Sequence, residues 1–172
     1  MIPARCFLIG GVSKTLGGGL RVAFLAVPER FRKTVPAALW ASIYTASPIN
    51  AEIVTRLIES GAASRIGEIK EQEAARRRAL AERYLGQLDI RTHAGSTVAW
   101  LPLPEEWTNA AAVTALRDRG VSVAPADLFW NGRTPPPDAL RISLGAPRTA
   151  ESLETGLVRI ADTLSSRPVP MQ

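Results

Sequence analysis

Two short apolar runs near the start of the chain enclose a polar, glycine-rich segment. Residues 6–10 (CFLIG) and 21–27 (RVAFLAV) have the length of strands, and GVSKTLGGGL lies between them. Runs this short, bounded by glycine, predict two strands that are buried on both sides and joined by a tight connection. Lys14 lies in that connection. The chain has 3 lysines against 18 arginines, so a lysine at this position needs an explanation.

Helix signals follow the second run. A first predicted helix opens at residues 28–29 and is disturbed by Pro36. A second runs from an N-cap at Ser47 to a glycine stop at Gly61, and a third spans about residues 63–86. The middle of the chain is therefore predicted to be helical.

The second half of the chain alternates strand and helix patterns. Strands are predicted over residues 97–103, 121–124 and 140–144, with capped helices over 108–119 and 149–164. The predicted fold class is α/β (α+β), with a mixed sheet packed by helices in two or three layers. A strand–turn–strand segment and long helices precede this sheet.

Composition excludes several classes of protein. At 172 residues the chain has the length of one domain, which can bury about 70% of its unfolded surface. It has no apolar run of membrane-helix length and no signal-peptide pattern. The single cysteine, Cys6, lies in an apolar run, where it predicts a small core residue and a reduced, cytoplasmic compartment.

The basic residues do not form a nucleic-acid-binding arm. The net charge is +5, but the arginines are spread along the chain, so we expect this chain not to contact DNA itself. The densest cluster, residues 74–84 (AARRRALAERY), is predicted to be a helix on which Arg76, Arg77 and Arg78 cover too wide an arc to form one stripe. It predicts a solvated helix face.

Lys14 admits three interpretations. It can be an exposed lysine in a glycine hairpin. A nucleotide phosphate loop needs glycine at positions occupied here by Leu8 and Ser13, so that pattern fails. It can also hold pyridoxal phosphate (PLP) as an imine, with Arg21 clamping the phosphate and Ser13 adding a hydroxyl.

The segment GVSKTLGGGLR resembles the cofactor-lysine segment of fold type I, aspartate-aminotransferase-like PLP enzymes, usually S-x-S-K-x-x-x-P-G-x-R. The resemblance implies that Lys14 is the aldimine lysine and that Arg21 binds the phosphate. Gly11 replaces the first serine of the pattern, and Gly18 replaces its proline. Both departures predict a weakened cofactor site.

The rest of the chain extends this resemblance. HAGSTVAWLPLPEEW, RGVSVAPADLFW and LRISLGAPRTAESLETGLVRIADTL are similar to the C-terminal small domain of the aminotransferase-like half of MocR-type regulators in the GntR family. The resemblance implies that Arg141 grips the α-carboxylate of a substrate or amino-acid-like effector. The alternative for Arg141 is a strand-edge arginine paired with Asp138.

The resemblance also predicts how the chain is organised. Residues 1–28 are a cofactor-lysine segment left from a large domain, 29–88 a helical connection, 89–165 the α/β small domain and 166–172 a flexible tail. In the family, other cofactor-holding parts and a winged helix-turn-helix lie upstream, so we expect part of a longer protein or a truncated gene product. Without those parts, no significant transaminase activity is expected.

Other candidate residues carry structural predictions. His93, the only histidine, is predicted in a loop or at a strand end, without a metal. No local feature gives Asp127 a catalytic role. The tryptophans are predicted to anchor the core or a subunit interface; they are Trp40, Trp100, Trp107 and Trp130.

Three functions remain open on the sequence. The first is the C-terminal part of a MocR-type regulator, a homodimer that binds PLP and an effector while a separate N-terminal domain binds DNA. The second is part of a genuine aminotransferase that moves amino groups between amino and keto acids. The third is a small interaction protein that has lost both tasks.

Overall fold

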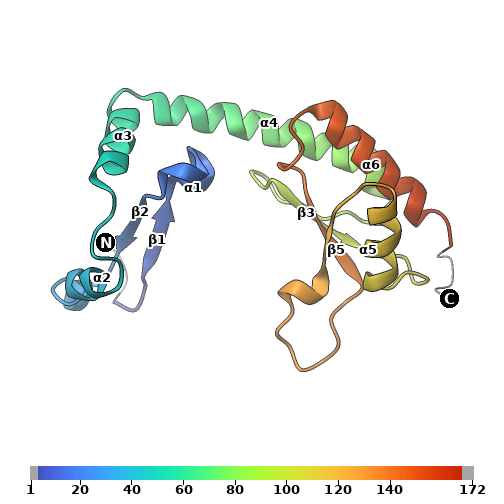
Figure 1. Ribbon diagram of the computed structural model, residues 1–172, viewed down its shortest axis with the longest axis horizontal. Coiled ribbons are helices and arrows are strands. Elements are labelled where there is room, and N and C mark those ends of the chain that lie inside the picture. Colours follow the sequence, from blue (N-terminus) through green and yellow to red (C-terminus); the bar gives the residue numbers. More distant parts are fainter. Residues whose placement is uncertain (1–3, 168–172) are drawn as a thin grey trace. The chain divides into compact units, whose positions relative to one another are not determined.

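The computed structural model describes residues 4–167, which form two compact units. The N-terminal unit is Met1–Lys70 and the C-terminal unit is Glu71–Gln172. Figure 1 shows a small hairpin with helices in the first unit and a sheet with helices in the second. The predicted α/β class is confirmed, while the predicted division into four segments stays a prediction.

The N-terminal unit begins with the predicted pair of strands. Strand β1 (Leu8–Gly11) pairs antiparallel with β2 (Ala23–Ala26). Their connection contains the four-residue helix α1 (Val12–Thr15) and the 3-10 helix η1 (Gly18–Leu20). The prediction of strands buried on both sides is wrong, because β1 is exposed throughout and β2 nearly so.

Three longer helices follow β2. After the 3-10 helix η2 (Glu29–Phe31), helix α2 covers Val35–Ile43, α3 Pro48–Glu59 and α4 Ala62–Leu85. Pro36 lies in the first turn of α2, where its missing N–H costs nothing, so it starts this helix and does not disturb one.

The predicted ends of α3 are confirmed. The Ser47 hydroxyl accepts the N–H of Asn50, and Gly61 has the positive φ of 71° that glycine tolerates after a helix.

The C-terminal unit contains the three-stranded sheet. After α4 come the 3-10 helix η3 (Gly86–Leu88), strand β3 (Val98–Pro102), helix α5 (Asn109–Asp118), strand β4 (Ala124–Pro125), the 3-10 helix η4 (Ala126–Phe129), strand β5 (Ala139–Ser143) and helix α6 (Ala150–Leu164). The strand order is β3-β5-β4, and both pairs are antiparallel, where the sequence predicted a mixed sheet.

One predicted strand is mostly absent from the described residues. Residues 121–123 are not part of the sheet, and only Ala124–Pro125 pair with β5. Proline ends the ladder because it has no N–H to donate. The other two strands and both flanking helices are confirmed, and the caps Thr108 and Thr149 accept N–H groups of Ala111 and Ser152.

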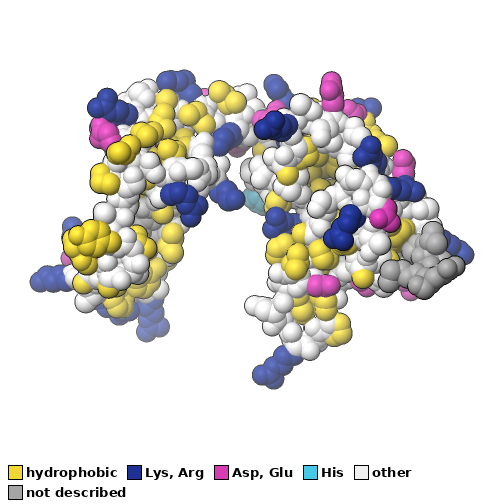
Figure 2. All heavy atoms as spheres, viewed as in Figure 1, with side chains coloured by type: hydrophobic (Ala, Val, Ile, Leu, Met, Phe, Trp, Pro, Cys, Tyr) yellow, Lys and Arg dark blue, Asp and Glu magenta, His cyan; other side chains and the backbone are white. Residues whose placement is uncertain are grey.

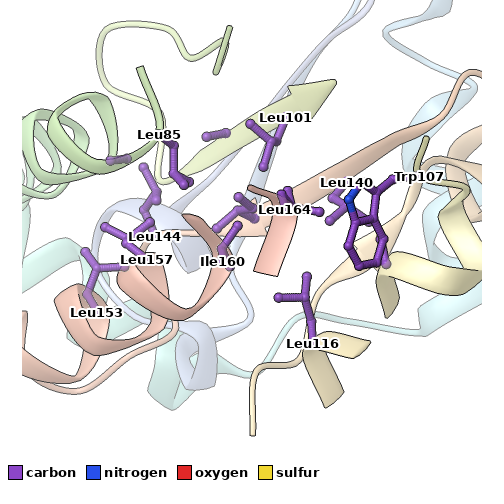
Figure 3. Packing of buried hydrophobic residues seen from close by; sticks show 14 residues of the cluster. Leu85, Leu101, Trp107, Leu116, Leu140, Leu144, Leu153, Leu157, Ile160 and Leu164 are labelled. Atoms are coloured by element: carbon purple, nitrogen blue, oxygen red, sulfur yellow. The ribbon is translucent and has the colours of Figure 1, made fainter. Parts of the chain in front are cut away.

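A continuous apolar core holds the C-terminal unit together. The C-terminal half of α4 and helices α5 and α6 pack on one face of the sheet, and Figure 3 shows their leucines meeting β3 and β5. Burying each such side chain stabilises a fold by about 1.5–3 kcal/mol relative to exposure. The largest fully buried side chains of this unit are Leu85, Leu101, Leu116, Leu140, Leu144, Leu157, Ile160 and Thr163.

Arg77 corrects the prediction of a solvated arginine face on α4. Its side chain is buried and donates to the carbonyl oxygens of Leu144 (2.9 Å) and Pro147 (2.7 Å). Its Nε also donates to Glu73 at 2.7 Å. Arg76 is exposed as predicted, so neighbouring arginines on one helix have opposite environments.

Cys6 and the tail also bear on the sequence predictions. Cys6 is exposed, so its prediction as a core residue is wrong; the strand that follows it, β1, is exposed as well. The tail predicted to be flexible, 166–172, falls mostly outside the described residues. Within residues 4–167, no helix is both long enough and apolar enough to cross a membrane.

Candidate functional site

The turn that carries Lys14 is held by a small local core. Val12 donates its N–H to the carbonyl of Val22 at 3.1 Å, which closes the connection between β1 and β2. The side chains of Val12, Val22 and Val54 are buried together, so the turn packs on α3. Ser13 and Lys14 therefore lie on one fixed turn, where Ser13 is half-buried and Lys14 is exposed.

Lys70 reaches this turn from α4. Its Nζ donates to the carbonyl oxygen of Leu16 at 3.1 Å and lies 3.4 Å from that of Lys14. These carbonyls belong to the last turn and the C-cap of α1, where a helix leaves acceptors without partners. No local pattern predicted this contact, although the scarcity of lysine singles out Lys70 as well as Lys14.

Arg21 ends the same turn in an unusual backbone conformation. Its φ of 49° and ψ of 35° are left-handed, which non-glycine residues rarely adopt. Such strain costs of order 1–3 kcal/mol and gathers at functional sites. The side chain is exposed and lines a groove of about 880 Å³ between the hairpin and α2, and Lys14 is not among the lining residues.

Arg141 lies on the central strand of the C-terminal sheet. Its neighbours Leu140 and Ile142 point into the core, so Arg141 is exposed on the opposite face. Its guanidinium carbon stacks 4.9 Å from the centre of the Phe129 ring. The ion pairs within residues 4–167 do not include Arg141 with Asp138, the pairing that the alternative required.

The two aspartates near this strand have structural partners. Asp138 accepts the backbone N–H of Asn109 at 3.0 Å, and Asp127 accepts its side-chain amide at 2.6 Å. Asn109 also receives the N–H of Ala139 at 2.8 Å, and its side chain is buried. The network anchors η4, which carries Phe129, beside the start of β5.

The remaining candidates lie apart from these residues. His93 is in a loop, as predicted, with its Nδ1 2.7 Å from the carbonyl oxygen of Ala94. Of the tryptophans, Trp107 is a core residue, whereas Trp40 and Trp130 are exposed. In the described part of the chain, no group of three or more histidine, cysteine or acidic residues is placed to hold a metal ion.

The donors on the Lys14 turn fit a phosphorylated aldehyde. An exposed primary amine can condense with a carbonyl, and an exposed guanidinium can pair with phosphate oxygens. The half-buried Ser13 hydroxyl adds a further donor. The turn therefore carries an amine, a guanidinium and a hydroxyl, donors of the kinds that can hold PLP, while Arg141 belongs to the other unit.

In sequence, the chain is similar to a transcriptional regulator. No family model matches it. Over 166 residues the chain is 32% identical to an uncharacterized HTH-type transcriptional regulator, YdeF, from Bacillus subtilis strain 168. The match covers 95% of this chain and 36% of the regulator, so the chain spans about a third of the length of that relative.

The fold is that of part of an aminotransferase. Kynurenine aminotransferase from Pyrococcus horikoshii, solved with PMP, has a TM-score of 0.84 and 16% sequence identity to this chain. The match covers 95% of this chain and 41% of the aminotransferase chain. A multiple substrate aminotransferase from Thermococcus profundus has a TM-score of 0.82 and 18% identity. The match covers 94% of this chain and 41% of that aminotransferase chain.

A third aminotransferase structure contains a phosphopyridoxyl compound. It is the alpha-aminoadipate aminotransferase LysN from Thermus thermophilus, complexed with N-(5'-phosphopyridoxyl)-L-leucine. The match covers 92% of this chain and 41% of the LysN chain, at a TM-score of 0.72 and 23% identity. At these identities the structures establish the fold alone. The predicted resemblance to an aminotransferase-like part of a regulator is confirmed.

Proposed function

We propose that the chain is the effector-side, aminotransferase-like part of a MocR-type transcriptional regulator of the GntR family. The observation that carries the proposal is that the sequence is similar to a regulator while the fold is similar to aminotransferases. The chain is similar to an HTH-type regulator over 95% of its length, and its structure matches aminotransferases. DNA binding is assigned to a separate domain and the site of action to the cytoplasm.

The proposed roles follow the chemistry of each residue. When PLP is bound, Lys14 would hold its aldehyde carbon through the side-chain amine. Arg21 and Ser13 donate to the phosphate, and the left-handed backbone at Arg21 supports a functional role there. When bound, PLP supplies the electrophilic carbon that captures an amino-group effector.

Arg141 is proposed to bind the α-carboxylate of an amino-acid-like effector. Stacking on Phe129 leaves the edge of a guanidinium free for paired hydrogen bonds to two carboxylate oxygens. The absence of an Arg141–Asp138 ion pair among the described residues supports this role. Calorimetry with an amino acid should show binding to the wild-type chain and weaker binding to Arg141→Gln.

The assignment of Lys14 is tested by trapping. The purified chain is incubated with PLP, reduced with borohydride and mapped by peptide mass. We expect the pyridoxyl-phosphate group on Lys14 in preference to the other two lysines, Lys33 and Lys70. The label should disappear in Lys14→Met and persist in the exposed control Lys33→Met. Equal labelling of all three lysines would overturn the assignment.

An active aminotransferase is the alternative function, which the shared fold suggests. Transfer of an amino group from an amino acid to a keto acid by the purified chain would support the enzyme over the regulator. We expect no such turnover.

The proposal includes a homodimer, supported by the apolar side chains exposed on the N-terminal unit. Sedimentation at micromolar concentration should show a dimer, and a monomer would contradict that part of the proposal.

A further inference from the structure

Two of the three lysines in this arginine-rich chain meet at one turn. Lys14 lies on α1 and Lys70 on α4, 56 residues later, yet the Lys70 ammonium is 3.4 Å from the Lys14 carbonyl oxygen and 3.1 Å from that of Leu16. The third lysine, Lys33, donates no such hydrogen bond within residues 4–167. The two lysines thus meet at the turn that follows β1.

Because α1 is only one turn long, most of its carbonyl groups must accept hydrogen bonds from outside the helix. The carbonyl of Val12 is used within the turn by the N–H groups of Leu16 and Gly17, at 2.8 and 3.2 Å. Residues 17–19 are three successive glycines, which lose much conformational freedom when ordered. The carbonyls of Lys14 and Leu16 receive side-chain donation from Lys70.

A lysine suits these two acceptors better than an arginine. The ammonium group is a compact charge whose three N–H donors can converge on neighbouring carbonyl oxygens. The planar guanidinium instead directs parallel donors at a fork-shaped acceptor. A cation is also favoured where helix carbonyls end.

We propose that Lys70 is a positioning residue for Lys14. By donating to the carbonyls of Lys14 and Leu16, the Lys70 ammonium fixes the backbone from which the Lys14 amine projects and orders the glycines that lead to Arg21. The inference rests on the proposed function, since it assigns Lys70 to the site of Lys14. It adds a residue that lies outside the cofactor-lysine segment.

The first test measures the rate at which Lys14 is trapped. Lys70→Met keeps most of the aliphatic stem and removes the charge and the donors. Because the contact is solvent-exposed, we expect about a threefold to tenfold slower labelling of Lys14 by PLP and borohydride. Lys33→Met is the matched control, because it removes an exposed lysine of the same unit and should leave the rate unchanged.

A second measurement reports the backbone directly. Amide hydrogen exchange over residues 12–20 should accelerate in Lys70→Met, while exchange in the C-terminal unit stays as in the wild type. Lys70→Gln keeps two N–H donors without the charge and should give an intermediate exchange rate. Faster exchange throughout the chain would show general destabilisation and would count against a local role.

The outcomes separate this inference from the proposed function. If wild-type labelling is selective for Lys14 and Lys70→Met changes neither the labelling rate nor the exchange of residues 12–20, the role of Lys70 is refuted and the role of Lys14 stands. If wild-type labelling shows no preference for Lys14, the proposed cofactor site fails first. Labelling of Lys70 itself would also overturn the inference, because a residue held by two carbonyls should react slowly.

Discussion

The two units of this protein differ sharply in how they bury apolar side chains. Among the described residues, the N-terminal unit has three buried hydrophobic residues, Val12, Val22 and Val54. The C-terminal unit has 17, most of which form a continuous core over the sheet. A core of three valines offsets little of the entropy of ordering a unit of this size.

The surfaces of the units show the same contrast. Of the 18 exposed large hydrophobic residues, 13 lie in the N-terminal unit and 5 in the C-terminal unit. Figure 2 shows hydrophobic side chains exposed over α2 and α3. The N-terminal unit also carries nine lysines and arginines against four acids, whereas the C-terminal unit has twelve of each. The whole net charge of +5 therefore comes from the N-terminal unit.

The proposed cofactor lysine and the larger apolar core thus lie in different units of the chain. The proposed cofactor lysine lies in the unit with the smaller core, on a turn fixed by local valines and by Lys70. The C-terminal unit has a continuous apolar core. We expect the two units to respond very differently to equivalent substitutions.

The largest expected effect is in the C-terminal core. Leu157→Ala removes a side chain that is only 1% exposed, and a cavity there should lower the free energy of unfolding by about 3 kcal/mol. Ile9→Ala in the N-terminal unit should change it by less than about 0.5 kcal/mol, because Ile9 is 75% exposed. Urea denaturation followed by tryptophan fluorescence measures the unfolding free energy of both variants. Equal losses would contradict the proposed difference between the two units.

A smaller effect is expected from the buried arginine of α4. Arg77→Met leaves the carbonyls of Leu144 and Pro147 without their charged donor, which should cost about 2 kcal/mol of unfolding free energy. The neighbouring Arg76→Met changes an exposed residue and is the control, with little expected effect. A similar loss in both variants would show that helix charge, and not the buried contact, accounts for the result.

The smallest effect concerns Tyr84, which joins α4 to α6 by donating to Glu154. This hydrogen bond is the main reason that the pKa of Tyr84 lies above its ordinary value, with burial and the Glu154 charge adding to it. A raised pKa stabilises the fold below about pH 10, and the gain is lost as the pH rises through the folded pKa.

Tyr84→Phe checks that pH dependence. The difference in unfolding free energy between the wild type and the variant should be constant near neutral pH and shrink as the pH rises above about 10. A difference that does not change with alkaline pH would mean that the hydroxyl makes no special contribution.

Local features could be predicted from the sequence because their causes lie within a few residues. Ser47 and Thr108 cap helices through N–H groups three residues later, and Gly61 and Gly120 have the positive φ expected after a helix. The Lys14 turn was located by its glycines and flanking apolar runs. Its short helix was missed, since no local pattern distinguishes one helical turn from a polar loop.

Tertiary structure decided which polar residues are solvated and which have partners. Arg76 and Arg77 are equivalent in sequence, but only Arg77 faces the carbonyls of Leu144 and Pro147, 67 and 70 residues away. Lys70 likewise acquires its role from a turn 54 residues earlier. The sequence by itself determined the longer helices, their caps, the resemblance and the candidate lysine. Packing alone could pair residues so far apart, because such contacts depend on which faces the fold brings together.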